Sequence, residues 1–151
     1  KVRSAEEMYQ AAISVFPFMD IAVMAAAVAD YTPREIAVEK IKKKEEEWNL
    51  SFIRTRDILK SLGGMKKPHQ LLVGFALETQ NETENALAKL SSKNADMIVL
   101  NSLNDPGAGF GHDTNKITIL DKDGSAHAYD MKSKKEVAKD IVDMIIKKTN
   151  V

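Results

Sequence analysis

Short apolar runs alternate with helical patterns through the middle of the chain. The runs are 21–28, 71–75 and 97–100. Each lacks the polar alternation of a strand with one wet face, so we expect these strands to be covered on both faces, as in a parallel sheet. A helical pattern opens at Asn81, and its inward positions are Ala86, Leu87 and Leu90. This alternation predicts an α/β fold with a Rossmann-like, doubly wound and mostly parallel sheet, forming one domain over 1–151.

Capping patterns mark helices near both ends of the chain. Ser4 with Glu7, and Ser133 with Glu136, have the spacing at which a serine side chain and a carboxylate satisfy free amide groups of a first helical turn. We predict a helix after Ser4 and a final helix that runs to about 148. A β-hairpin is predicted just before the final helix, with strands at 116–120 and 125–129 around an Asp-Gly turn.

Two segments do not fit this alternation of strands and helices. The stretch 31–49 is dense in charges of both signs, and we expect a solvated loop there. The stretch 101–115 is rich in glycine and also predicts a long loop, which is either functional or mobile. Between the first loop and the next helix, 50–55 alternates apolar and polar residues, so we predict a half-buried strand outside the main sheet.

Composition limits the classes of partner. The 151 residues are 44% hydrophobic and 29% charged, with 22 basic and 22 acidic residues, so no global field favours nucleic acid or an anionic membrane. Cysteine is absent and no apolar run reaches the roughly 18 residues of a membrane span, so we expect a cytoplasmic protein. The dinucleotide and P-loop glycine motifs are absent, and the three histidines lie far apart. We therefore assign no NAD site and no metal ligands.

Four sequence blocks carry a family resemblance. In chain order they are 25–31, 39–43, 55–59 and 73–79. In this order and spacing the chain resembles the bacterial-type, CTP-dependent phosphopantothenate-cysteine ligases, the synthetase domain of the bifunctional coenzyme A biosynthesis flavoprotein. The resemblance covers nearly the whole chain but only the C-terminal half of that domain. We therefore expect the N-terminal part to be missing, this chain alone to be inactive, and no FMN site in this portion.

The resemblance implies a ligase reaction in two steps. The carboxylate of 4'-phosphopantothenate attacks CTP to give an acyl-cytidylate, and the amine of cysteine then displaces CMP. Mg²⁺ is expected with the triphosphate. The lysine of the Lys-x-Lys-Lys motif is Lys40, which the resemblance makes the catalytic residue, and Lys42 and Lys43 add to its local field. A charge run of this kind, taken alone, is typical of a solvated surface.

The nucleotide-binding residues also follow from the resemblance. Ala26 and Ala27 would contact the acyl-cytidylate through the main chain, and Asp30 would contact the nucleotide. Without the resemblance, tight packing explains the two alanines, and capping of a turn explains Asp30. The next segment is a turn that opens a helix and binds CTP in the family, and it consists of Arg56, Asp57, Ile58 and Leu59. Arg56 stands where the family commonly has proline.

Three further residues complete the predicted site. The counterpart of Phe75 packs against the nucleotide, whereas the same residue read alone is a core residue. Lys89 and Lys93 are spaced i, i+4 on one helix and match the two CTP-binding lysines of the family. Lysines at this spacing are also common as plain surface residues.

Two other functions compete with the ligase. One is a non-catalytic module whose main property is self-association, and the other is an unrelated nucleotide-binding Rossmann-like domain. The alternating segment 50–55 predicts a homodimer formed by strand pairing, which would bury Phe52 and Trp48. Folding of this strand back onto its own domain is the alternative.

Overall fold

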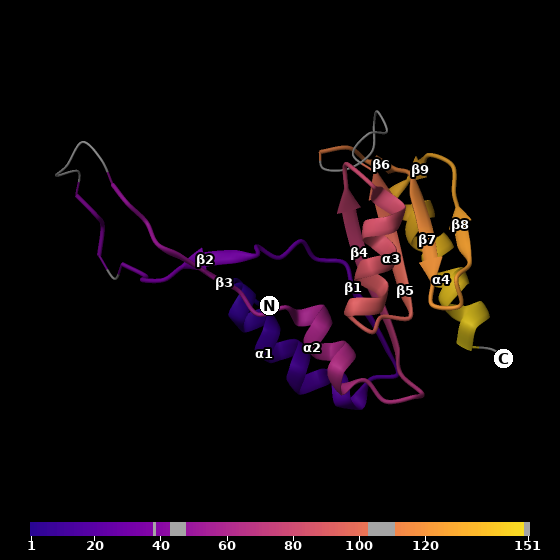
Figure 1. The fold of residues 1–151 in the computed structure, drawn as a ribbon, viewed down its shortest axis with the longest axis horizontal. Helices are drawn as coiled ribbons and strands as arrows, with labels where there is room; N and C mark the ends of the chain where they lie inside the picture. Colours follow the sequence, from indigo (N-terminus) through magenta and orange to yellow (C-terminus); the bar gives the residue numbers. More distant parts are fainter. Residues whose placement is uncertain (38, 43–47, 103–110, 150–151) are drawn as a thin grey trace.

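A five-stranded sheet forms the centre of the computed structural model, which describes residues 1–37, 39–42, 48–102 and 111–149. In spatial order its strands are β1 (Ile21–Met24), β4 (Leu71–Glu78), β5 (Met97–Ser102), β7 (Ile117–Asp121) and β8 (Ala126–Ala128). The first three are parallel, and β7 and β8 run antiparallel to their neighbours. The predicted α/β class, the mostly parallel sheet and the C-terminal hairpin are confirmed (Figure 1).

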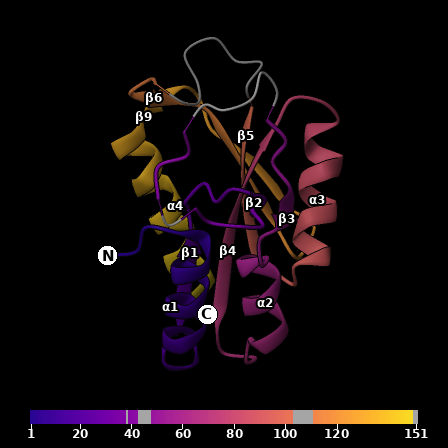
Figure 2. The same ribbon diagram turned by 90° about the vertical axis from the view of Figure 1, so that its left-hand side faces the viewer.

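One face of the sheet is covered by α4 (Lys134–Thr149). Val137, Ile141 and Ile145 from this helix share a buried cluster with alternate strand residues, including Val99. Figure 2 shows α4 on one side of the strands and α3 on the other. Strands β4, β5 and β7 are therefore buried between helices, as the continuous apolar runs at 71–75 and 97–100 predict.

The opposite face carries α1 (Ala5–Val15), α2 (Ile58–Met65) and α3 (Glu82–Ser92). A short 3₁₀ turn, η1 (Phe16–Phe18), joins α1 to β1 and buries Phe16. Helices α1 and α2 pack on Leu72 of β4. Helix α3 packs farther along the same face, on residues of β4, β5 and β7 that include Ala76 and Ile98. Every second residue of β4 thus faces α2 and α3, and the residues between them face α4.

Both predicted serine caps are present, but the reciprocal bond of a full capping box is present only at Ser133. At Ser4 the Glu7 carboxylate accepts from the Arg3 amide instead, at 2.7 Å. The Ser4 hydroxyl accepts a hydrogen bond from the Glu7 amide at 3.1 Å, and the Ser133 hydroxyl accepts one from the Glu136 amide at 3.3 Å. Glu136 returns the interaction by accepting from the Ser133 amide at 3.1 Å. These bonds satisfy amides that a first helical turn leaves without partners, and so fix where α1 and α4 begin.

The prediction for 21–28 is only partly correct. Strand β1 ends at Met24, and the residues after it are irregular. Ile21 and Val23 remain 41% and 44% exposed, so β1 is not covered on both faces. The physical reason is its position at the edge of the sheet, because α4 packs over β4, β5 and β7 instead.

The inward face of α3 also differs from the prediction in one residue. Ala86 and Leu90 are buried as predicted, but Leu87 is 40% exposed. Positions i and i+4 lie above one another on a helix, whereas i+1 is rotated by about 100° away from them. One apolar side chain of the pattern therefore points to solvent.

An arm projects from the body in the region predicted to be a solvated loop (Figure 1). It begins as β2 (Tyr31–Pro33), which pairs antiparallel with β3 (Phe52–Arg54). The strand predicted within 50–55 is thus confirmed outside the main sheet, but its predicted half-burial is not, because Phe52 and Ile53 are exposed on an arm that projects from the body. The loop prediction for 31–49 is wrong at its start. A second small pairing, β6 (Thr114–Asn115) with β9 (Lys132–Ser133), was not predicted.

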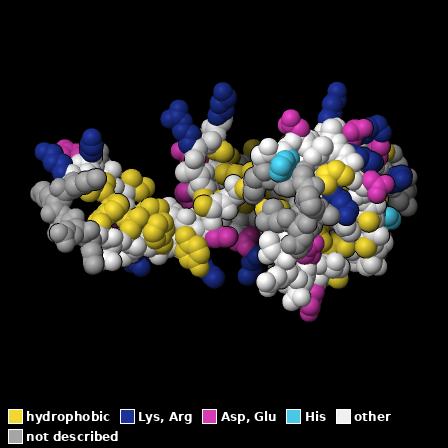
Figure 3. Space-filling model, turned by 90° about the horizontal axis from the view of Figure 1, so that it is seen from above, with side chains coloured by type: hydrophobic (Ala, Val, Ile, Leu, Met, Phe, Trp, Pro, Cys, Tyr) yellow, Lys and Arg dark blue, Asp and Glu magenta, His cyan; other side chains and the backbone are white. Residues whose placement is uncertain are grey.

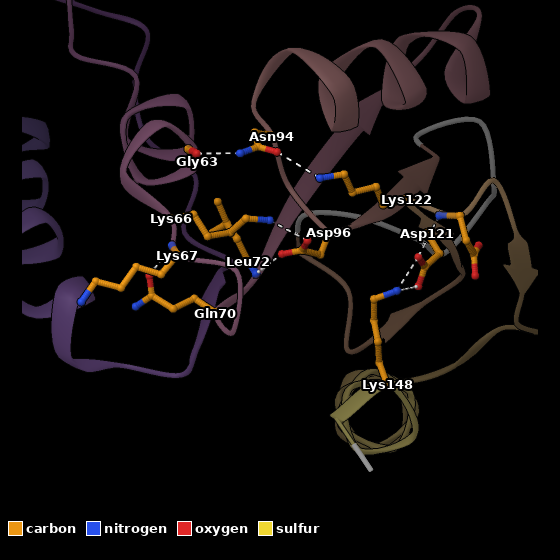
Figure 4. Close-up of polar contacts among 11 residues, drawn as sticks. Gly63, Lys66, Lys67, Gln70, Leu72, Asn94, Asp96, Asp121, Lys122 and Lys148 are labelled. Carbon is orange, nitrogen blue, oxygen red and sulfur yellow. Dashed lines mark hydrogen bonds and ion pairs between the residues drawn. The ribbon is translucent and has the colours of Figure 1, made fainter. Parts of the chain in front are cut away.

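A polar network ties together the amino-terminal ends of β4 and β5 (Figure 4). The Asp96 carboxylate accepts from the Leu72 amide at 2.7 Å and from the Lys66 ammonium at 2.5 Å. The side chains of this ion pair are only 16% and 7% exposed. Farther along the same end, Lys148 of α4 pairs with the buried Asp121 at 2.6 Å. These contacts join β4, β5, β7 and α4 at this end of the sheet.

Across the described ranges, none of the helices is both long and apolar enough to span a bilayer.

Candidate functional site

A cleft of about 1070 Å³ opens at the carboxyl ends of β1, β4 and β5. This is the edge at which open α/β sheets bind ligands. Ten of the eleven residues predicted from the sequence line this one cleft, and they are Ala26, Ala27, Asp30, Arg56, Asp57, Ile58, Leu59, Phe75, Lys89 and Lys93. The fold therefore brings together residues that are up to 67 positions apart in the sequence.

The start of α2 forms one wall of the cleft. Asp57 is the N-cap of this helix, and its carboxylate accepts from the Lys60 amide at 2.9 Å. The same carboxylate forms an ion pair with Lys93, the C-cap residue of α3. Partial burial raises the pKa of Asp57, but the hydrogen bonds from Lys93 and Lys60 outweigh it, so the pKa lies below its ordinary value. Asp57 is therefore an anion that orients Lys93 at the rim.

Close backbone contact between α2 and α3 holds this pair in place. Gly63 of α2 lies against the end of α3, where an added Cβ would come within 1.8 Å of the Lys93 carbonyl oxygen. The Asn94 side chain donates to the Gly63 carbonyl oxygen at 2.8 Å across the same contact. Only a residue without a side chain fits this approach.

Arg56 is held by α1. Its guanidinium lies 3.1 Å from the Glu6 carboxylate and 4.6 Å from the centre of the Tyr9 ring. The ion pair is exposed, so its contribution to stability is small. These contacts nonetheless direct the Arg56 side chain toward α1, and Arg56 also lines the cleft.

The floor of the cleft is formed by β4. Gly74 lies beneath Leu59, and a Cβ there would meet the Leu59 side chain at 2.5 Å. Phe75 is half-buried and packs against the core on the α4 side of the sheet. Phe75 therefore contacts the core and also lines the cleft.

The lining is predominantly cationic. Its basic residues are Arg54, Arg56, Lys60, Lys89, Lys93 and Lys134, and its carboxylates are Asp30 and Asp57. Asp57 is already paired with Lys93. A concave site with this excess of positive charge favours a ligand that carries several negative charges.

Sequence reasoning missed several polar residues of the lining, among them Arg54, Lys60, Asn101, Asn115 and Lys134. Asn101 follows a buried strand directly, which is the position from which α/β folds present ligand-binding side chains. Asn115 and Lys134 come to the cleft through the unpredicted pairing of β6 with β9. Their sequence gave no signal of that pairing, because each strand is two residues long.

Lys40 is not part of this cleft. It lies on the arm, exposed to solvent, as do Ile41 and Lys42. Lys43, the last lysine of the predicted motif, lies outside the described residues. Within one chain, the structure therefore leaves the predicted catalytic lysine apart from the predicted nucleotide site.

No group of three or more histidine and acidic side chains that could hold a metal ion occurs in the part of the chain that the structure describes. The cleft itself offers the carboxylates Asp30 and Asp57. Asp57 is engaged by Lys93 and the Lys60 amide, which leaves Asp30. One carboxylate fits Mg²⁺ carried by a polyphosphate, because Mg²⁺ keeps several waters and takes one or two carboxylates together with substrate phosphates.

Comparisons with known proteins agree with this geometry. Residues 1–149 match the family model described as the DNA/pantothenate metabolism flavoprotein C-terminal domain. The chain is 46% identical over 144 residues to the coenzyme A biosynthesis bifunctional protein CoaBC of Bacillus subtilis. It is 54% identical over 145 residues to a protein named cysteine/cysteine sulfinic acid decarboxylase from an unknown prokaryotic organism. These matches cover 95% and 96% of the chain but only 35% and 40% of the relatives.

A solved structure shows the same fold. The crystal structure of the C-terminal domain of the coenzyme A biosynthesis bifunctional protein CoaBC superposes with a TM-score of 0.75 at 40% sequence identity. The match covers 95% of this chain and 62% of that one. The agreement of family model, relatives and fold excludes the alternative of an unrelated nucleotide-binding domain. The chain belongs to the family of the DNA/pantothenate metabolism flavoprotein C-terminal domain.

Proposed function

We propose that this chain forms the CTP-binding part of a phosphopantothenate-cysteine ligase of coenzyme A biosynthesis, acting in the cytoplasm. The observation that carries the proposal is the assembly of ten predicted nucleotide-binding residues in one cationic cleft. Its substrates are CTP, 4'-phosphopantothenate and cysteine. The 46% identity to CoaBC of Bacillus subtilis supports the same reaction.

Attack of a carboxylate on a phosphorus atom of CTP depends mainly on positioning of the reactants and on nearby positive charge, and the cleft supplies both. Lys89 and Lys93 stand on the α3 side of the cleft, where their ammonium groups attract the triphosphate. The start of α2, at Ile58 and Leu59, offers backbone amides to the nucleotide. Mg²⁺ bound with the triphosphate would add a cation that polarises the phosphates. Asp30, a carboxylate of the cleft lining, would hold it.

Calorimetric titration of the chain with CTP, ATP and NAD tests the proposal. The ligase predicts a clear preference for CTP. Equal affinity for CTP and ATP, or no binding of either nucleotide, contradicts it. Replacing Lys89 or Lys93 by Met should weaken CTP binding more than CMP binding, because a triphosphate offers more negative charge to a cationic pair. Lys139 lies on α4 in a solvent-exposed ion pair, so Lys139→Met is the matched control.

We propose that the protein is a homodimer that pairs through the arm. The described part of the arm exposes large apolar side chains, which are Tyr31, Ile36, Ile41, Trp48, Leu50, Phe52 and Ile53. Figure 3 shows hydrophobic side chains gathered on the arm. Ile36 is 85% exposed and Trp48 is 65% exposed, which is costly in water for a surface that no partner covers. The free edges of the two-stranded β2–β3 sheet offer unpaired backbone groups to a second copy.

The dimer also bears on catalysis. Lys40 lies on the arm and outside the cleft of its own chain. A second copy that receives the arm would bring Lys40 of one chain to the nucleotide site of the other. Sedimentation equilibrium decides the oligomeric state: the proposal predicts twice the chain mass at micromolar concentration and a shift toward monomer for Phe52→Glu. A monomer mass without concentration dependence contradicts it.

The name of the 54% identical relative suggests a second function, decarboxylation of cysteine or cysteine sulfinic acid. The chain matches 40% of that protein, so the match leaves most of it unaccounted for. The cleft of about 1070 Å³ is also far larger than a cysteine molecule. Release of carbon dioxide from either amino acid by the purified chain would support this function in place of the ligase.

A further inference from the structure

The cleft crosses the carboxyl edge of the sheet and has a polar end on each side. Lys89 and Lys93 come from α3, which packs on one face. Asn101 lies two residues after Val99 on β5 and therefore shares the face that packs against α4. Lys134 is the first residue of α4 itself. Positive charge thus reaches the cleft from two opposite sides.

Hydrogen bonds fix this second polar end. The Lys134 amide donates to the Asp113 carbonyl oxygen at 2.9 Å, which anchors the start of α4. Asn115 is only 7% exposed, and its Nδ2 donates to the Asn101 Oδ1 at 3.1 Å. Its own Oδ1 accepts from the Lys116 amide at 3.0 Å. Asn115 is therefore fixed in place, and among the described residues the Asn101 side chain is engaged through its Oδ1, so that its Nδ2 can donate to a ligand.

The lysines of this segment differ in their partners. Lys132 is paired with Asp140 at 2.8 Å and lies 5.4 Å from the Tyr129 ring centre. Lys134 makes no ion pair with any side chain in the described ranges, and it lines the cleft. The next residue, Lys135, is exposed and lies outside the cleft lining. Lys134 is thus the cation that this side of the sheet presents to a ligand.

We infer that Lys134, together with Asn101 of the same cleft lining, binds a phosphate group of a substrate that spans the cleft. The inference rests on the proposed function, which brings two phosphate-bearing substrates to this cleft. An ammonium group is a compact point charge with three donors, and a neighbouring amide adds a donor of fixed direction. The phosphate can belong to the triphosphate of CTP or to 4'-phosphopantothenate, since both offer the same chemistry.

Calorimetry on Lys134→Met separates the two sources, with Lys135→Met as the matched control. Each variant is titrated with CTP, CMP, 4'-phosphopantothenate and pantothenate. We expect Lys134→Met to weaken binding of either CTP or 4'-phosphopantothenate about tenfold. The matching ligand with fewer phosphates, which is CMP or pantothenate, should change less than about twofold. Loss for CTP alone assigns the triphosphate, and loss for 4'-phosphopantothenate alone assigns the other substrate. Lys135→Met should leave all four affinities unchanged.

The inference is overturned if Lys134→Met binds both CTP and 4'-phosphopantothenate with unchanged affinity. It is also overturned if Lys135→Met loses as much affinity as Lys134→Met. Titration with inorganic pyrophosphate distinguishes failure of the phosphate site from failure of the proposed ligase function. If the chain shows no preference for CTP yet binds pyrophosphate through Lys134, the ligase proposal fails and the phosphate site stands. If CTP is preferred and Lys134→Met has no effect on any ligand, the ligase proposal stands and the phosphate site fails.

Discussion

Replacing Gly63 by Ala should separate α2 from α3 and weaken the nucleotide site. The new Cβ would lie 1.8 Å from the Lys93 carbonyl oxygen, where ordinary contact begins at 3.4 Å. The atom that it meets belongs to the backbone, so the clash is relieved only by moving a helix by more than an ångström. Overpacking of this kind costs about 2–3 kcal/mol of unfolding free energy. For a domain of this size that corresponds to a melting temperature roughly 4–12 °C lower.

Gly64→Ala is the control, because it makes the same chemical change one residue along α2. A Cβ there meets nothing within 4 Å. The helical position should gain about 0.5–1 kcal/mol from the lower backbone entropy of alanine in the unfolded chain. Urea unfolding followed by circular dichroism compares the two variants.

The same displacement should reach the cleft. Moving α3 away from α2 separates Lys93 from Asp57, so Gly63→Ala should bind CTP more weakly than Gly64→Ala. If the two variants unfold at the same urea concentration, the close contact between α2 and α3 is not what holds this wall of the cleft together.

Three further predictions follow from named contacts. Asp96→Ala should cost about 3–5 kcal/mol in urea unfolding because it leaves a buried lysine and an amide unpaired, whereas Asp143→Ala, in an exposed pair, should cost less than about 1 kcal/mol. Asp57 has a lowered pKa, so its stabilising contribution is complete above its unfolded pKa of about 3.9 and is lost as pH falls through the folded pKa. The difference in unfolding free energy between wild type and Asp57→Asn should accordingly shrink below about pH 4, and a constant difference would refute this. Lys40→Gln, in a protein completed with the N-terminal part of its relatives, should abolish pyrophosphate release from CTP without lowering the melting temperature; near-normal release refutes its catalytic role.

Local patterns predicted most of the helices and the inner strands. The capping serines marked where α1 and α4 begin, because a hydroxyl that accepts from an amide three residues ahead acts over a few ångströms and needs no tertiary contact. The apolar run of β4 predicted a strand buried on both faces because it lacks polar alternation. Sequence reasoning failed where long-range placement decided the outcome. Val23 has the apolar pattern of a central strand but lies at the sheet edge.

The candidate site, too, was predicted only in part from the sequence. Ten residues of the cleft were predicted by their resemblance to a family, and the sheet edge then explains why they meet. Lys134 was missed because it reaches the cleft through two-residue strands that carry no periodicity. The position of Lys40 was missed because a charged segment does not reveal whether it folds over its own domain or extends as an arm.

The location of bound CTP tests the central claim most directly. Two-dimensional nitrogen–proton NMR spectra of the labelled chain, recorded during titration with CTP and separately with ATP, report on each amide along the cleft. The account predicts that CTP shifts the amide resonances of residues 56–59 and of Phe75 at concentrations where ATP does not. Shifts confined to residues outside the cleft, or the same shifts at the same concentration of ATP, would contradict it.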